Sequence, residues 1–457
     1  MLAGNGALAA AGSVAQTRVG LRPPRSGASR FRSRPAGRGE ALAVVTIATA
    51  AVLLTAGFGD GIAFGLMATF GIASPWLFLF PPLFGGLAYC WLRNARPGRE
   101  YLIECYLMLV FMVAALTLQS FVFAELNLFG LLQLITFIIV LVLLQGVFAN
   151  APAWLSEAFP RAMRGAHYFL CGCVVIAFLA WHLLGIDLSL VKLLNPAGTD
   201  AAFTSFRPTG FSKEPQWAAF ALGASYIGVY LLFPAERLRA LLAMSVVAVL
   251  LQSGTLLLFS GLYGAAVLWQ TESSVKRTAS VILVALALTA QVTLFWGRTS
   301  QVLDVRDASL LQRVSSGSVA WSVVEESFPL GVGYGNFRDA ADYSDPRWNR
   351  FLDLNKAQFY KSDFVLLNFM AELGVLSLVI LVWLFQVLAR GGSVLPLAFY
   401  GLTLVLSGTL LLPSLLVVAA ITGALISQKR AAAEARPAIS SGSGALRSRA
   451  EVAGLGA

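Results

Sequence analysis

Long apolar runs alternate with short polar connections along most of the chain. A helix needs about 20 mainly apolar residues to cross a bilayer, and most of these runs have that length. They predict membrane-spanning helices near residues 41–58, 62–92, 101–119, 128–149, 168–186, 217–234, 239–252, 255–270, 279–297, 363–389, 393–411 and 413–427. The pattern therefore predicts an all-α polytopic membrane protein with about 12 transmembrane helices.

Two parts of this pattern require a break. The run 62–92 is too long for one straight helix, and Pro81-Pro82 is expected to break it, because proline lacks the N–H that continues a helix. The two short runs 239–252 and 255–270 are expected to turn over at Ser253-Gly254.

The composition supports a membrane protein and excludes a soluble enzyme. Hydrophobic residues make up 58% of the 457 residues and charged residues only 12%, about half of the ~25% typical of soluble domains. The four cysteines lie in or beside apolar runs, and His167 and His182 are the only histidines. This distribution suggests neither a disulfide framework nor a metal site, and no cofactor is expected.

Positive charge sets the expected orientation of the helices, because cytoplasmic connections carry an excess of Lys and Arg. The connections that twelve spans place inside contain Arg93, Arg96, Arg99, Arg161, Arg164, Arg237, Arg239, Lys276, Arg277 and Arg390. The short connections on the other side, 59–61, 120–127, 253–254 and 412, contain no Lys or Arg. We therefore interpret the net charge of +10 as a topology signal, with no nucleic acid as partner.

Both ends of the chain are basic and of low complexity. Residues 1–39 contain seven Arg and no Asp or Glu, a composition that cannot bury a core. We predict that 1–39 and 428–457 are disordered cytoplasmic tails around a membrane domain at 40–427. Residues 1–39 also resemble an Arg-rich transit peptide, although a basic cytoplasmic tail is the favoured interpretation. Two cytoplasmic termini require an even number of spans, which twelve satisfies.

The candidate chemistry lies in the two connections predicted on the outer face, 187–216 and 298–362, since long loops are often functional. In the first, Arg207 and Lys213 stand at the membrane surface, and Gly210 allows a tight turn. A guanidinium can bind a phosphate through two parallel hydrogen bonds. The simpler alternative is that these long side chains extend to the lipid headgroups.

The second loop contains a glycine triplet, Gly331, Gly333 and Gly335. Alternate glycines let backbone N–H groups face one way, as an anion-binding nest requires, although such triplets are also common in simple turns. Arg313 and Arg338 lie nearby in the sequence and favour the anion site. The spacing of the glycines does not fit a dinucleotide-binding loop.

Acidic and aromatic residues follow the triplet and resemble the lining of a sugar site, in which carboxylates bind hydroxyl groups and rings contact sugar faces. They are Asp339, Asp342, Asp345, Trp348, Asp353 and Tyr360. Trp321 and Lys361, on either side of this stretch, are further candidate binding residues. A solvated loop of mixed charge is the alternative interpretation.

Three polar residues mark the beginning of the apolar run 363–389. Asn368 and Glu372 are four residues apart and share a helical face, and a carboxylate inside an apolar run is normally functional or paired. Asp363 and Glu372 are nine residues apart, on opposite sides of a helix, so we do not expect a catalytic pair. We interpret Asn368 and Glu372 as a structural polar contact to another helix and Asp363, at the outer mouth, as the better candidate base.

Together these motifs resemble the O-antigen ligase/polymerase superfamily. Their order is R-x-x-G-x-x-x-x-P-Q from Arg207, S-G-L-Y-G from Ser260, then Arg313, P-L-G-V-G-Y-G-N-F from Pro329 and D-x-x-x-L-x-x-x-A-E-L-G from Asp363. The resemblance covers roughly residues 200–390. It implies a metal-independent bacterial inner-membrane glycosyltransferase with around a dozen helices and one large periplasmic loop, which here lies between spans 9 and 10.

The resemblance also implies roles for particular residues. Arg207 and Arg313 would bind the diphosphate of an undecaprenyl-diphosphate-linked oligosaccharide, and the Gly331–Gly335 turn would shape the loop over it. Ligases of the family carry a His where this chain has Asp363, and their Ser-Arg pair in the short span is replaced here by 261–263. Tyr263, in that segment, is a further candidate binding residue.

The carboxylate at 363 favours the polymerase and exopolysaccharide branch of the family. The sequence thus predicts an enzyme that joins lipid-linked repeat units at the periplasmic face, surrounded by membrane lipid, with a flippase and a chain-length regulator as expected partners. Two alternatives stay open. One is a ligase of the same family that transfers glycan to lipid or protein. The other is a transporter for a small anion, with the long loop as a lid.

Overall fold

The computed structural model describes residues 39, 42–46, 48–49, 76–123, 127–186, 215–251, 253–269, scattered positions from 274 to 293, 308–337, 364–408 and 410–434. All of them belong to the compact unit Gly37–Ala457. Every element that is assigned in these ranges is helical, and the described ranges contain no strand. The all-α prediction is confirmed for this part of the chain.

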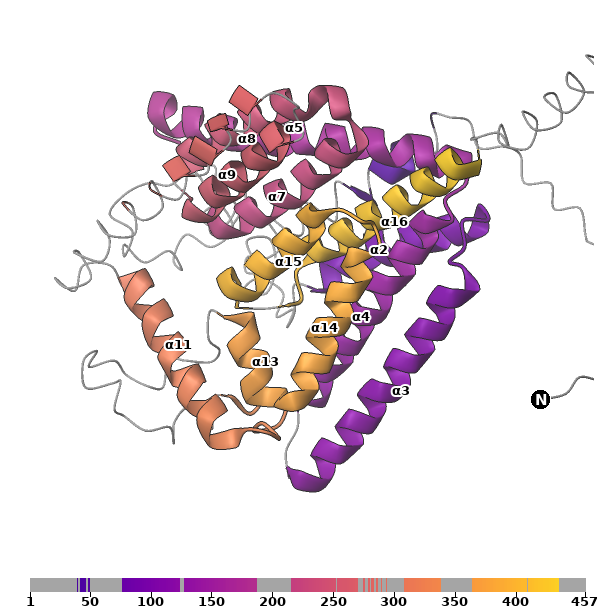
Figure 1. Ribbon diagram of the computed structural model, residues 1–457, viewed down its shortest axis with the longest axis vertical. Coiled ribbons are helices and arrows are strands. Elements are labelled where there is room, and N and C mark those ends of the chain that lie inside the picture. The colour runs from indigo at the N-terminus through magenta and orange to yellow at the C-terminus, as the bar shows by residue number, and fades with distance from the viewer. Residues whose placement is uncertain are drawn as a thin grey trace, which may run out of the picture. The chain divides into compact units, whose positions relative to one another are not determined.

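The helices are shown in Figure 1. In chain order they are α2 (Trp76–Leu92), α3 (Arg99–Val122), α4 (Leu128–Ala149), α5 (Ala153–Leu184), α7 (Pro215–Leu232), the short 3₁₀ helix η1 (Pro234–Glu236), α8 (Arg237–Leu251), α9 (Gly254–Trp269), α11 (Ala308–Ser327), α13 (Val365–Leu373), α14 (Val375–Ala389), α15 (Val394–Leu406) and α16 (Pro413–Glu434).

Four of these helices are long and apolar enough to cross a bilayer, namely α3, α4, α5 and α16. Shorter apolar helices accompany them at Leu83–Leu92, Gln216–Leu232, Gly254–Trp269, Val375–Ala389 and Val394–Leu406. Helix α3 exposes large apolar side chains that include Tyr106, Leu107 and Phe121, as a lipid-facing helix does. The described residues therefore form a helical membrane protein.

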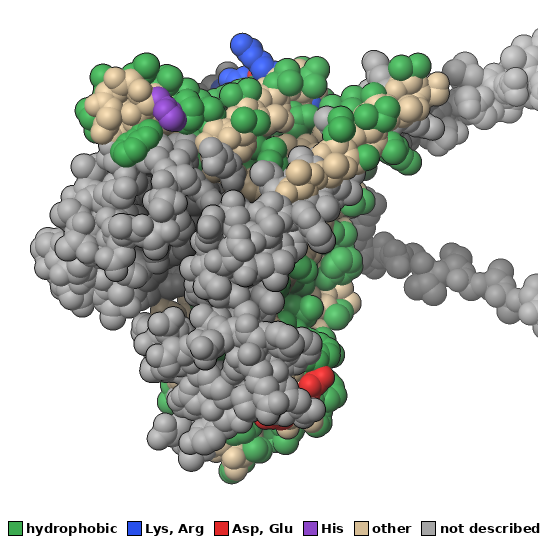
Figure 2. All heavy atoms as spheres, turned by 90° about the vertical axis from the view of Figure 1, so that its left-hand side faces the viewer, with side chains coloured by type: hydrophobic (Ala, Val, Ile, Leu, Met, Phe, Trp, Pro, Cys, Tyr) green, Lys and Arg blue, Asp and Glu red, His purple; other side chains and the backbone are tan. Residues whose placement is uncertain are grey.

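Several predicted spans coincide with helices. The predicted span 128–149 is helix α4, and the predicted turn at Ser253-Gly254 separates α8 from α9. On the face that Figure 2 shows, the described side chains are mainly hydrophobic, and the visible Lys and Arg gather at the upper end.

Two predicted boundaries are wrong because helices continue through prolines. Helix α2 runs through Pro81-Pro82 without a break, and α5 begins at Ala153 and contains Pro160. The beginning of α5 is amphipathic, since Leu155 and Phe159 are buried while Arg161 is exposed. Packing of this buried face stabilises the helix over a stretch that hydropathy assigned to a connection.

The predicted single span 363–389 is also wrong, because α13 and α14 meet in a V at Gly374 (Figure 1). Gly374 has φ +56° and ψ −134°, a conformation that only glycine adopts without strain. Helix α16 in turn continues to Glu434, so residues 428–434 are helical and not disordered. Lys429 Nζ donates to the carbonyl of Gly391 at 2.7 Å and Arg430 to Asn150 Oδ1 at 2.9 Å, which fixes this last part of the helix.

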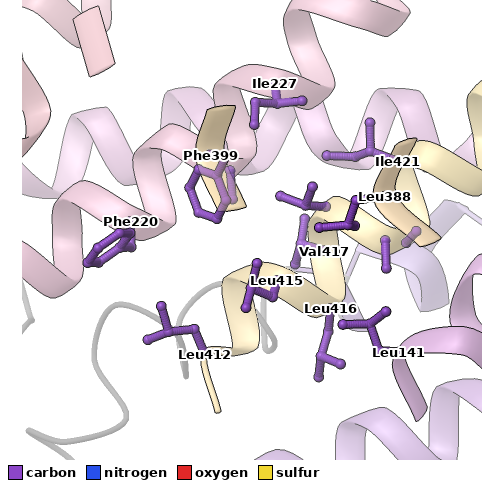
Figure 3. Close-up of a cluster of buried hydrophobic side chains, with 14 of the residues drawn as sticks. Leu141, Phe220, Ile227, Leu388, Phe399, Leu412, Leu415, Leu416, Val417 and Ile421 are labelled. Carbon is purple, nitrogen blue, oxygen red and sulfur yellow. The ribbon is translucent and has the colours of Figure 1, made fainter. Parts of the chain in front are cut away.

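Helix α16 lies at the centre of the apolar core. Its residues from Pro413 to Leu425 are all buried, and Figure 3 shows Leu415, Leu416 and Val417 beside Leu141 of α4 and Leu388 of α14. A β-carbon on Gly423 would overlap the carbonyl oxygen of Gln145. The absence of a side chain at 423 is therefore what lets α16 and α4 approach so closely.

A polar network joins α3, α4 and α14 at the end that the charge pattern assigns to the cytoplasm. Arg390 donates to both carboxylate oxygens of Glu104 at 2.6 Å, and the indole of Trp383 donates to Glu104 Oε1 at 2.9 Å. Gln145 donates to the carbonyl of Val387 at 2.6 Å. Two-pronged Arg–carboxylate pairs also fix orientation, so the network sets how these helices pack.

The close contact at Gly423 yields a stability prediction. Gly423→Ala is expected to lower the free energy of unfolding by about 1–3 kcal/mol, because a methyl group there forces α16 away from α4. The measurement is thermal or SDS-induced unfolding of the purified protein in detergent.

Gly172→Ala in α5 is the matched control, because a β-carbon there meets nothing within 4 Å. It should leave the protein as stable as before or slightly stabilise it. Equal effects of the two substitutions would contradict the inference.

Candidate functional site

The connection between α15 and α16 joins the flanks of the two predicted outer loops. Gln216, at the beginning of α7, donates from Nε2 to the carbonyl of Leu406. The backbone N–H of Val365, at the beginning of α13, donates to the carbonyl of Ser407 at 2.7 Å. Two segments that are about 150 residues apart in the sequence therefore begin their helices side by side.

Helix α11, which carries Arg313, packs against Phe364, the residue before α13 begins. A β-carbon on Gly317 would lie 2.6 Å from Cε2 of Phe364, so the glycine allows α11 to contact the ring directly. Arg313 lies in α11 four residues before Gly317, and its side chain lies outside the described part. Below this contact, an apolar cluster of Val319, Ala320, Val323, Val324, Phe337 and Ala371 holds α11 against α13.

The glycine turn, residues 329–336, is hydrogen-bonded to the α13–α14 junction. The N–H of Val332 donates to the backbone carbonyl of Ala371 at 2.8 Å, and the N–H of Gly333 donates to that of Glu372 at 3.1 Å. In return, the N–H of Val375 donates to the backbone carbonyl of Pro329 at 2.8 Å. A β-carbon on Gly331 would lie 2.7 Å from the carbonyl oxygen of Glu372. The backbones thus approach too closely for any other residue.

This arrangement changes the interpretation of the triplet. Gly331, Gly333 and Gly335 all have positive φ, at +77°, +89° and +92°, as a nest of glycines was expected to have. However, the N–H of Gly331 donates to Ser327 at 3.0 Å and that of Gly333 to Glu372. The prediction of an anion-binding nest is therefore wrong for these two groups, because the protein itself supplies their acceptors.

Gln119 of α3 joins the turn to the helix junction. Its Nε2 donates to the carbonyl of Glu372 at 3.1 Å, and its Oε1 accepts from the N–H of Tyr334 at 3.4 Å. Asn127 donates from its N–H to the carbonyl of Tyr334 at 3.0 Å and caps α4 by accepting from Gly130 at 2.8 Å. The sequence analysis missed these residues, although a glutamine near the end of an apolar run was a signal that could have found Gln119.

Asn368, predicted to contact another helix, makes a polar contact to a helix connection. Its Nδ2 donates to the carbonyl of Gly408 at 3.1 Å, in the α15–α16 connection. Glu372 is buried, with 3% of its surface exposed. Burial of the Tyr334 phenol raises its pKa, and the negative charge of Glu372 raises it further.

Two candidate binding residues, Trp321 and Tyr263, differ in exposure. Trp321 is half exposed on α11, and its indole N–H donates to Glu325 Oε1 at 2.6 Å, so its ring is accessible. Tyr263 is fully buried. Its ring stacks on Tyr226 with centroids 5.0 Å apart, and its hydroxyl donates to the carbonyl of Gly223 at 3.4 Å. The prediction that Tyr263 binds substrate is wrong, because its surface is used in packing α9 against α7.

The remaining candidate residues lie outside the described part of the chain. These are Arg207, Gly210, Lys213, Arg338, Lys361 and Asp363. What the structure does establish is the position of their nearest described neighbours, Gln216, Phe337 and Phe364.

No model of a known protein family matches the chain, and no curated protein matches its sequence. The proposal of a function therefore depends on the residues and on the geometry above.

The junction at Gly374 yields a prediction about local opening. In Gly374→Ala the new methyl group would overlap the carbonyl oxygen of Pro329, so the turn must move and lose its hydrogen bonds to α13. Amide hydrogen exchange at Val332 and Gly333 is expected to become about tenfold faster or more. Mass spectrometry of exchanged peptides over 328–337 measures this.

Gly401→Ala in α15 is the control, because a β-carbon there meets nothing within 4 Å. It should leave the exchange of these amides unchanged. Unchanged exchange in Gly374→Ala as well would show that the turn does not depend on the junction.

Proposed function

We propose that the protein is an inner-membrane glycosyltransferase that polymerises undecaprenyl-diphosphate-linked oligosaccharide repeat units at the periplasmic face. One structural observation supports this proposal in addition to the sequence motifs. The flanks of both predicted outer loops and the helix of Arg313 meet around Phe364 and the connection Leu406–Gly408. Arg313 lies on helix α11 and Asp363 directly precedes Phe364 in the sequence, which supports a site that contains both.

Chain geometry limits how far these candidates lie from that place. Asp363 directly precedes Phe364, and two residues of extended chain reach at most about 7 Å from Val365. Lys213 precedes Gln216 by three residues, a reach of about 10 Å. Arg313 is one helical turn from Gly317, about 6 Å along the axis. Arg207, nine residues before Gln216, is much less restricted.

The proposed reaction is a single displacement at the anomeric carbon of the donor. The bond from that carbon to the diphosphate oxygen breaks while a hydroxyl oxygen of the acceptor sugar bonds to it, and the configuration inverts. Arg313 and Arg207 stabilise the charge that develops on the departing diphosphate, and Asp363 accepts the proton of the hydroxyl. Cationic side chains supply this stabilisation, so the proposal needs no cofactor.

The proposed topology has twelve spans, with both termini in the cytoplasm and the long loop 298–362 in the periplasm. The distribution of Lys and Arg supports it. The lipid tail of the donor then stays in the bilayer while its sugars reach the outer loops, where the half-exposed ring of Trp321 offers an apolar face to a sugar.

The first test removes the diphosphate-binding charge. Arg313→Ala is expected to slow transfer by about 10²–10³-fold, since one positioned donor is lost from the leaving group. Lipid-linked repeat units should accumulate and long polymer should disappear, which gel electrophoresis of extracted glycans measures.

Arg161→Ala is the control, because Arg161 is exposed at the end of the protein that is predicted to be cytoplasmic. It should leave polymer length unchanged. A normal polymer length in an Arg313→Ala strain would overturn the assignment.

The second test addresses the base. Asp363→Asn keeps the shape of the side chain and removes its charge, so transfer by the purified protein should fall about 10²–10⁴-fold while the donor still binds. Glu326→Gln, an exposed carboxylate at the end of α11, should transfer normally. Full activity of Asp363→Asn would exclude Asp363 as the base.

A further inference from the structure

An apolar cavity lies between α2, α4, the beginning of α5 and the first turns of α16. Its empty volume is about 660 Å³, which includes space open to the surroundings, and Val44, Val45, Ala48 and Thr49 also line it. Its lining is almost entirely aliphatic and aromatic and includes Ala48, Leu87, Leu144 and Phe159. Residues 44–49 and the lining parts of α2, α4 and α5 lie toward the end that the charge pattern assigns to the cytoplasm.

The lining contains one polar group that the surrounding protein does not satisfy. Tyr89 lines the cavity, and its hydroxyl is buried without a hydrogen-bond partner among the described residues. A buried hydroxyl without a partner is unfavourable, and such groups are rare in native proteins. A ligand with an oxygen acceptor would remove this deficit.

Positive charge lies over the ring of Tyr89. The guanidinium of Arg93 stands 5.6 Å from the centroid of the Tyr89 ring. Arg96 follows in the same short connection and Arg99 begins α3, while the neighbouring acid Glu100 is 3.7 Å from Arg430. The connection therefore carries an excess of positive charge beside an apolar cavity.

We propose that this cavity binds an anionic diacyl phospholipid of the surrounding bilayer. One acyl chain occupies the cavity, and the phosphate lies between Arg93 and the hydroxyl of Tyr89. An acyl chain gains little on moving from bilayer to cavity, because lipid tails are as apolar as the lining. The headgroup therefore decides which lipid binds, and the excess of arginine selects a net negative one over a zwitterionic one. This site is independent of the proposed glycan transfer.

Native mass spectrometry of the purified full-length protein tests the proposal, with phosphatidylglycerol and phosphatidylcholine as probes. We expect one tightly retained phosphatidylglycerol per protein and at least tenfold less phosphatidylcholine at equal concentration. Arg93→Ala should abolish this preference, and Ala48→Phe, which fills the cavity, should abolish retention of both lipids.

Two matched controls separate the site from general lipid contact. Arg99→Ala removes an exposed charge at the beginning of α3, and Ala114→Phe adds a ring to the exposed face of α3. Both should keep the retained lipid. Gel filtration reports folding, and should Ala48→Phe misfold, Arg93→Ala decides alone. Equal retention of the two lipids, an unchanged preference in Arg93→Ala, or retention only of a polyprenyl phosphate would each overturn the proposal.

Discussion

The break at Gly374 imposes a constraint on which much of the fold depends. A helix that ends leaves carbonyl groups without donors, and at a buried helix end such as this one no water supplies them. Here the donors are the N–H groups of Val332 and Gly333 and the side chain of Gln119. The turn, the end of α3, and through Phe337 the helix α11 are therefore fixed to the α13–α14 junction as one unit.

Hydropathy predicted the long helices but not this junction. The span 128–149 is α4 because a continuous apolar run of that length has a single stable solution in a membrane. The run 363–389 is as apolar, yet its path is decided by hydrogen bonds from a turn some 40 residues upstream, which no local pattern contains. The amphipathic beginning of α5 was missed for a related reason, since half of its surface is polar and only tertiary packing makes it a helix.

The sequence predicts those features of the candidate site that depend on neighbouring residues in the chain. It does not predict those that depend on contacts between distant segments. A polar side chain in an apolar run must find a partner, so a contact of Asn368 could be predicted, but not that the carbonyl of Gly408 makes it. Tyr263 was misassigned, since only the fold reveals that its ring is enclosed by Tyr226 and Phe259. The convergence on Leu406–Gly408 was invisible to sequence, because that connection contributes backbone carbonyls and carries no motif.

The attachment of Gln119 has a mechanical consequence for α3. This helix of 24 residues is about 36 Å long, whereas the hydrocarbon core of a bilayer measures about 30 Å. Little of its surface packs against protein, and a helix longer than the hydrocarbon core can fit it by tilting. Because Gln119 holds the end of α3 to the glycine turn, a change in the tilt of α3 would be transmitted to that turn.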